Sequence, residues 1–181
     1  MYEFIKQEIE DIYKGDYKRL RTKTVLYGEI EGRWHTHLHP GLTTDEIEQF
    51  EARTGTQFPL AYKEFLTFYN GCYLFDLLRM GGKELDSYKG LSIEEQTRST
   101  VDVQDIQEIH LRKRTPKDHF IFADSIVHNS YYVIDSSKNV LEVDFRTKKV
   151  VKTFSTLKEC IIEVIKEGKK NLEDEVYFEF K

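Results

Sequence analysis

Three histidines at alternate positions are the residues of this sequence whose types and spacing best suit metal binding. His35, His37 and His39 are separated by Thr36 and Leu38. In an extended strand their side chains share one face, about 7 Å apart along the chain. Imidazole nitrogens bind zinc, copper and nickel, but a structural zinc site usually takes a fourth ligand, and no Cys or carboxylate can be assigned to it from the sequence. We therefore predict no native metal site and interpret the triplet as a polar edge segment with solvated histidines; metal binding through it is the alternative.

Motifs typical of catalytic and cofactor sites are absent. The sequence has no Gly-x-Ser-x-Gly motif, no His-Glu-x-x-His motif and no glycine-rich loop placed ahead of a helix to hold phosphate. His110, His119 and His128 lie near predicted element ends, where a structural histidine is more frequent than a general base. Cys72 and Cys160 lack metal or redox spacing and are expected to be buried free thiols. We predict that the protein is not an enzyme and takes no cofactor.

Acidic residues and one tyrosine gather in a polar segment, residues 83–100, that has no clear periodicity. It is long enough to be a functional loop, and such loops carry binding residues more often than core elements do. A negative patch would steer a basic protein partner, and tyrosine is enriched at interfaces. The alternative is that these charges only solubilise a loop. The predicted partner-binding residues are Glu84, Asp86, Tyr88, Glu94 and Glu95, with Asp102 and Asp105 just beyond them.

Length and composition indicate one globular domain. The chain has 181 residues, of which 39% are hydrophobic, enough for a sizeable core. No apolar stretch approaches the ~20 residues of a membrane-spanning helix. The N-terminus lacks the pattern of a secretory signal, so we expect a cytoplasmic protein. A formal net charge of −5 disfavours nucleic acid as a partner, because phosphates require basic surface, and suits a basic protein.

Periodicity predicts both helices and strands. We expect an amphipathic helix over residues 2–13, an extended piece or hairpin over 22–34, a buried strand over 72–80 and a short helix over 101–112 whose apolar face includes Ile109 and Leu111. After His119 the period changes to about two, and short connections between apolar runs favour antiparallel neighbours. A final helix is predicted from a Ser155 cap to Gly168, followed by a tail over 175–180 able to add an edge strand.

Two helices are signalled back to back between Gly41 and Gly71. Thr43 is placed to cap the first, and Glu46, three residues later, completes a capping box. Pro59 suits the start of a second helix, predicted over residues 60–70, because its missing N–H costs least there. These are signals of structure, and none of these residues is chemically reactive.

The same residues resemble the opening motif of the SUKH superfamily. The resemblance extends over roughly residues 41–167. In many relatives a glycine-rich turn follows the Phe-Ala-Asp segment, whereas residues 125–130 of this chain contain no glycine. The matching strings are Gly41-Leu42-Thr43, Glu46-Ile47, Phe50-Glu51, Phe58-Pro59-Leu60, Tyr62-Lys63, Phe65-Leu66 and Asn70-Gly71, then residues 120–124, 131–135 and 153–157 in the family's order.

That superfamily includes a fungal regulator of cell-wall synthesis and many bacterial immunity proteins. Together with the periodicity, the resemblance implies a single α+β domain with a mostly antiparallel (mixed) sheet, helices packed on it and a C-terminal helix. We expect residues 1–40 to form an N-terminal helix and extended elaboration, and residues 41–181 to form the SUKH-like domain of one compact unit. The function implied is that of a non-catalytic immunity protein that occludes the active site of a cognate toxin, often a nuclease. A regulatory scaffold or adaptor is the alternative.

Overall fold

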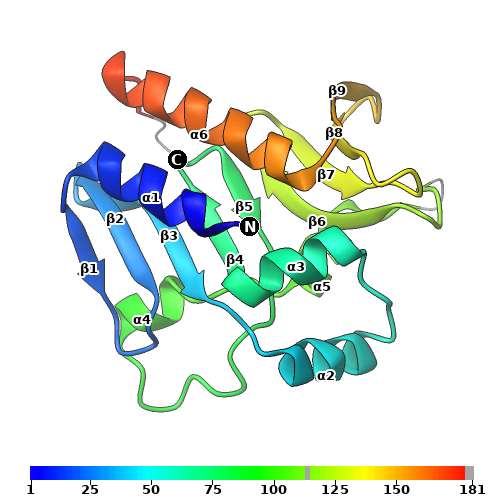
Figure 1. The fold of residues 1–181 in the computed structure, drawn as a ribbon, viewed down its shortest axis with the longest axis horizontal. Coiled ribbons are helices and arrows are strands. Elements are labelled where there is room, and N and C mark those ends of the chain that lie inside the picture. Colours follow the sequence, from blue (N-terminus) through cyan, green and yellow to red (C-terminus); the bar gives the residue numbers. More distant parts are fainter. Residues whose placement is uncertain (113–114, 178–181) are drawn as a thin grey trace.

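The strands form one continuous antiparallel sheet in the computed structural model, which describes residues 1–112 and 115–177. Within these residues each strand pairs with its neighbour in sequence, and after His119 the connections between strands are short, as the sequence predicted. This order confirms the predicted α+β class (Figure 1). The strands are β1 (Tyr17–Arg19), β2 (Val25–Ile30), β3 (Arg33–Pro40), β4 (Tyr69–Leu74), β5 (Leu78–Met80), β6 (Phe120–Ser125), β7 (Ser130–Ile134), β8 (Val140–Asp144) and β9 (Val150–Phe154).

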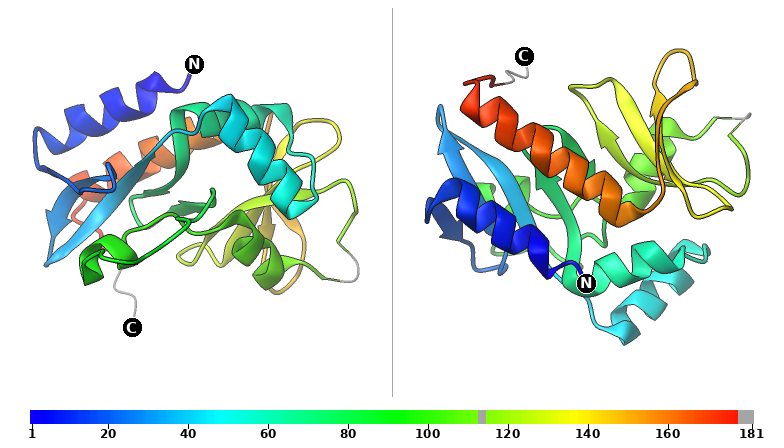
Figure 2. Two further views of the ribbon diagram at one scale, coloured as in Figure 1. Left: turned by 90° about the horizontal axis from the view of Figure 1, so that it is seen from below. Right: turned by 45° about the horizontal axis from the view of Figure 1, so that its top comes forward.

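Helices cover both faces of the sheet. Figure 2 shows α1, α3 and α6 over one face and α4 and α5 over the other, with α2 beside α3. None of the helices in the described parts of the chain combines the length and apolar composition that crossing a membrane requires. The helices are α1 (Glu3–Tyr13), α2 (Thr44–Thr54), α3 (Leu60–Phe68), α4 (Ile93–Thr97), α5 (Val103–His110) and α6 (Leu157–Glu173).

Each face of the sheet has its own hydrophobic core. The larger core lies under α1, α3 and α6 and includes Phe50, Phe65 and Phe122, all fully buried. A smaller one lies under α5, where Ile106 meets residues of β6, β7 and β8. Ile109 and Leu111, predicted to belong to the apolar face of α5, are exposed instead, and His110 takes the inward position.

The predicted helical pair is present, with a shorter second helix. Thr43 Oγ1 accepts the Glu46 amide at 3.3 Å, and Glu46 Oε2 accepts the Thr43 amide at 2.7 Å, which completes the capping box. The second helix ends at Phe68, two residues before the predicted end, because Tyr69 pairs with Pro40 and begins β4. Pairing with a strand distant in sequence therefore overrides the local helical signal.

The buried strand predicted over residues 72–80 is wrong, because the chain forms a hairpin there. Phe75 and Asp76 make the turn between β4 and β5 with φ of +55° and +62°. Left-handed backbone is unusual at non-glycine residues, so the sequence carried no turn signal. The turn is held by Asp76, whose carboxylate accepts hydrogen bonds from Tyr73 and Arg33.

The last helix is longer than predicted. Its cap is Thr156, whose Oγ1 accepts the Glu159 amide at 3.1 Å, and not Ser155. Gly168 does not end it, because α6 continues to Glu173, and a Cβ built at Gly168 would lie 2.2 Å from Cγ of Phe75. The glycine is therefore a close contact between α6 and the β4–β5 turn. Of the predicted edge strand over 175–180, residues 175–177 are not in a strand and the remainder lies outside the described residues.

The turn between β6 and β7, where many relatives have glycines, is formed without any. Asn129 adopts φ of +51°, which asparagine tolerates better than most residues.

His128, in the same turn, contacts two carboxylates. Its Nε2 lies 2.8 Å from Glu167 Oε1 of α6, and its Nδ1 lies 3.4 Å from Glu142 Oε1 of β8. Hydrogen bonds to Glu142 and then Glu167 raise the pKa of this imidazole to about 9.

His128 should make stability depend on pH. The pKa of His128 is higher in the folded than in the unfolded protein. Its contribution to the free energy of unfolding is therefore complete below the unfolded pKa of about 6.5 and is lost as the pH rises through about 9. We expect His128→Gln to lower the free energy of unfolding by about 1.5–3 kcal/mol near pH 6 and by much less near pH 10. Urea unfolding at both values measures this. A deficit independent of pH, or one equalled by the control His119→Gln, would contradict the assignment.

Candidate interaction surface

The polar segment of residues 83–100, here called the strap, leaves and re-enters the fold at a single point. Gly82 forms a parallel bridge with Asp102. The Gly82 amide donates to Val101 O and the Val103 amide donates to Gly82 O, both at 2.9 Å. The ends of the strap are therefore fixed to one another, and the strap crosses the face of the sheet that α5 also covers.

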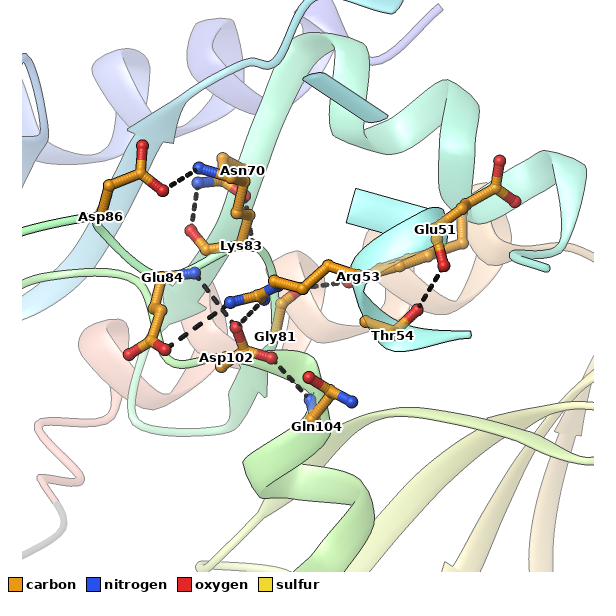
Figure 3. Close-up of polar contacts among 11 residues, drawn as sticks. Glu51, Arg53, Thr54, Asn70, Gly81, Lys83, Glu84, Asp86, Asp102 and Gln104 are labelled. Atoms are coloured by element: carbon orange, nitrogen blue, oxygen red, sulfur yellow. Dashed lines mark hydrogen bonds and ion pairs between the residues drawn. The ribbon is translucent and has the colours of Figure 1, made fainter. Parts of the chain in front are cut away.

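Asn70 of β4 holds both strap ends, and Figure 3 shows its contacts with Lys83 at the first of them. Its side-chain Nδ2 donates to Lys83 O at 2.7 Å, and its Oδ1 accepts the Lys83 amide at 2.6 Å. Thr100 Oγ1 donates to Asn70 O at 2.9 Å. A Cβ on Gly82 would lie 2.4 Å from Asn70 Oδ1, so this position requires glycine. Asn70, predicted to close a helix, instead anchors the strap.

Arg53 of α2 joins the strap to α5, as Figure 3 also shows. Its guanidinium pairs with Asp102 and lies 3.7 Å from Glu84 Oε1. Asp102 is buried and caps α5 by accepting the Gln104 amide at 2.9 Å. Asp102 is therefore a structural carboxylate, whereas Glu84 and Arg53 are both partly exposed to solvent.

The middle of the strap forms α4, which the sequence did not signal as periodic. Ser92 and Glu95 make a capping box at its start. Arg21, from the β1–β2 connection, donates to both Glu95 oxygens at 2.9 and 2.7 Å, and its guanidinium holds the pKa of that carboxyl down at about 2. Lys18 of β1 lies 2.6 Å from Glu94. Glu94 and Glu95, both predicted to bind a partner, therefore tie the strap to β1 and to the β1–β2 connection. Glu95 is also buried.

The remaining predicted residues are exposed. Asp86 has 89% of its side chain in solvent and pairs only with Lys83 in the described structure. Tyr88 is 38% exposed. Sequence reasoning missed Ile93, which is 81% exposed at the start of α4. The strap contains four acidic and three basic residues, so its charges nearly cancel. Its surface is therefore of mixed charge, and two large apolar side chains, Tyr88 and Ile93, are exposed on it.

The histidine triplet is buried, which contradicts the predicted solvated edge segment. β3 is an interior strand paired with β2 and β4, so His35, His37 and His39 lie within the fold. Burial lowers the pKa of all three, to about 3 for His37 and about 4 for His39, which keeps the rings neutral. Across residues 1–112 and 115–177, no three His, Cys, Asp or Glu side chains are grouped to hold a metal ion.

A buried polar network lies beside the strap, between β5, β6 and α5. Arg79 donates to both Asp124 oxygens, at 2.9 and 2.7 Å, and His110 Nε2 lies 2.9 Å from Asp124 Oδ2. The His110 ring packs against both Tyr131 and Phe145, with centroids 5.0 and 4.8 Å away, and these two rings also contact one another. These contacts fix α5 on the sheet.

Both cysteines are free and buried, as predicted. Burial raises the pKa of Cys72 and of Cys160 well above the ordinary value of a thiol. Because the thiolate is the reactive form, these two side chains behave as small apolar residues.

Comparison with the curated proteins gives no match. A family's sequence model matches residues 41–163, more than half of the chain. The matched region begins just before the capping box of α2, contains the strap and β4 to β9, and ends within α6. The chain therefore belongs to the SMI1/KNR4 family (SUKH-1).

Proposed function

We propose that this chain is a non-catalytic immunity protein that binds a cognate toxin domain of nuclease type and occludes its active site. Family membership is the observation that carries the proposal, because the superfamily it resembles includes many immunity proteins. The formal net charge of −5 adds to it, since the nucleic-acid groove of a nuclease is basic and an acidic protein is steered toward it.

The strap is the surface that we assign to the partner. It presents Tyr88 and Ile93 to solvent on a backbone fixed at both ends, and a fixed surface loses little entropy on binding. Apolar and aromatic side chains at the centre of an interface supply most of its energy. Glu84 and Asp86 are the nearby carboxylates left exposed to attract basic groups.

The proposal is tested by co-expression with a toxin encoded next to this gene. We expect growth rescue and co-purification of the two proteins. Amide hydrogen exchange of the complex should show added protection in residues 83–100. Co-purification without rescue would support the scaffold or adaptor alternative, and failure of every adjacent candidate both to bind and to be neutralised would refute the immunity role.

Ile93→Asp should weaken the complex by at least about 30-fold, the effect of losing an interface residue worth about 2 kcal/mol. The variant should fold normally, because an acidic residue in the first turn of a helix is favourable. Isothermal titration with the purified toxin domain measures the change.

The matched control is Ile126→Asp, which places the same charge at a 54% exposed isoleucine in the β6–β7 turn. Its affinity should equal that of the unmodified protein. Equal losses in the two variants would show that the strap is not the contact surface.

A further inference from the structure

A cavity of about 310 Å³ lies between the sheet and the last residues of the strap. Its floor contains His37, Tyr73 and Arg79, which are direct cross-strand neighbours on β3, β4 and β5 and so share one face. Arg98 and its neighbours in the strap line the opposite side. The volume is at the lower end of the range for small-molecule sites.

The lining carries positive charge and no carboxylate. Three arginines contribute to it, and two are balanced by buried acids behind the cavity wall: Arg33 by Asp76 at 2.6 Å and Arg79 by Asp124 at 2.7 Å. The Arg98 guanidinium pairs with no carboxylate within the described part of the chain. The cavity therefore keeps one uncompensated positive charge together with further guanidinium N–H donors.

A buried polar atom on the floor also has no partner. Nε2 of His37 has no hydrogen-bond partner among the described residues, and the residue is buried, with only 6% of its surface exposed. Burial, then the neighbouring His39 and the charge of Arg98, lower the pKa of this ring to about 3, so it stays neutral and can give or accept one hydrogen bond. A buried polar atom in this state is costly unless a ligand or water satisfies it.

Flat rings complete the lining. The Tyr73 ring lies 5.2 Å from that of His37, centroid to centroid, so two rings lie next to one another on the floor. Aromatic faces and guanidinium planes bind planar rings by stacking. The combination of rings, one unbalanced cation and one unsatisfied imidazole nitrogen distinguishes this cavity from a simple anion site.

We infer that this cavity binds a small molecule that has a planar ring and one anionic group, either a carboxylate or a phosphate monoester. The anionic group pairs with Arg98, and the ring lies against Tyr73. A polar group on the ring satisfies Nε2 of His37. The cavity shares Thr97, Arg98 and Ser99 with the strap, but the inference does not depend on the proposed toxin binding, because the probes are tested on the protein alone.

The test is titration calorimetry at low ionic strength with four probes: uridine monophosphate, 4-hydroxybenzoate, uridine and inorganic phosphate. Trp34 is the only tryptophan of the chain and is one of the residues at this cavity, so its fluorescence provides a second readout of binding there. We expect at least one ring-bearing anion to bind with a Kd below about 1 mM and to change Trp34 emission. Whether uridine monophosphate or 4-hydroxybenzoate binds more tightly identifies the anionic group.

Arg98→Gln should weaken that binding at least about tenfold, because it removes a charge-assisted hydrogen bond. The matched control is Lys89→Gln, which removes one positive charge from an exposed part of the same strap without touching the cavity. The inference is overturned if neither ring-bearing anion binds, if uridine or inorganic phosphate binds as tightly as they do, or if Arg98→Gln binds like the Lys89→Gln control.

Discussion

Asp124→Ala is expected to lower the free energy of unfolding by about 3–5 kcal/mol, because it leaves a largely buried cation without its counter-charge. Asp124 is almost fully buried and accepts two hydrogen bonds from Arg79 and one from His110. Burial alone would raise the pKa of this carboxyl, but the bonds to His110 and Arg79 outweigh it and lower the pKa. Chemical denaturation near neutral pH measures the loss.

Asp11→Ala is the control, since it removes an exposed carboxylate from α1. The contribution of Asp124 to the free energy of unfolding should also decrease at low pH. Because its folded pKa is depressed, its contribution is present above the unfolded pKa of about 3.9 and is lost as the pH falls through the folded value. A small loss like that of Asp11→Ala would show that this network does not stabilise α5 on the sheet.

Tyr62→Ala should cost about 3–5 kcal/mol, as the loss of a large buried aromatic side chain does. Tyr62 is fully buried in α3, its ring contacts those of Phe58, Phe120 and Phe122, and its hydroxyl donates to Gly81 O at 2.8 Å. Tyr62→Phe keeps the ring and should cost only about 0.5–1.5 kcal/mol, the net value of one hydrogen bond. Urea unfolding separates the two variants.

The hydroxyl of Tyr62 also has a local consequence, because Gly81 precedes the base of the strap. Tyr62→Phe should increase amide exchange at Gly82 and Val103, which pair there, more than its small change in global stability explains. Tyr17→Phe, at an exposed tyrosine of β1, should change neither quantity. Unaltered exchange in Tyr62→Phe would show that α3 and the strap base are not coupled.

Features with partners close in sequence were predictable. The Thr43 capping box joins residues three apart, and the antiparallel pairing of β6 to β9 follows from short connections between apolar runs. The family resemblance rests on the same local signals and is confirmed by the match over residues 41–163. Asp86 and Tyr88 are exposed, as expected for residues of a polar loop.

Features with partners far along the chain were decided by the tertiary structure alone. Glu95 was expected to be a free binding residue, but Arg21, 74 positions earlier, takes its carboxylate. Gly168 is a glycine inside a helix because Phe75 occupies the space that a Cβ would fill, and the histidines of β3 are buried because strands pair on both sides. The spacing of residues along the sequence predicts contacts only between residues about one helical turn or one hairpin apart. Burial and charge pairing depend on which distant elements meet, and that is a property of the folded chain.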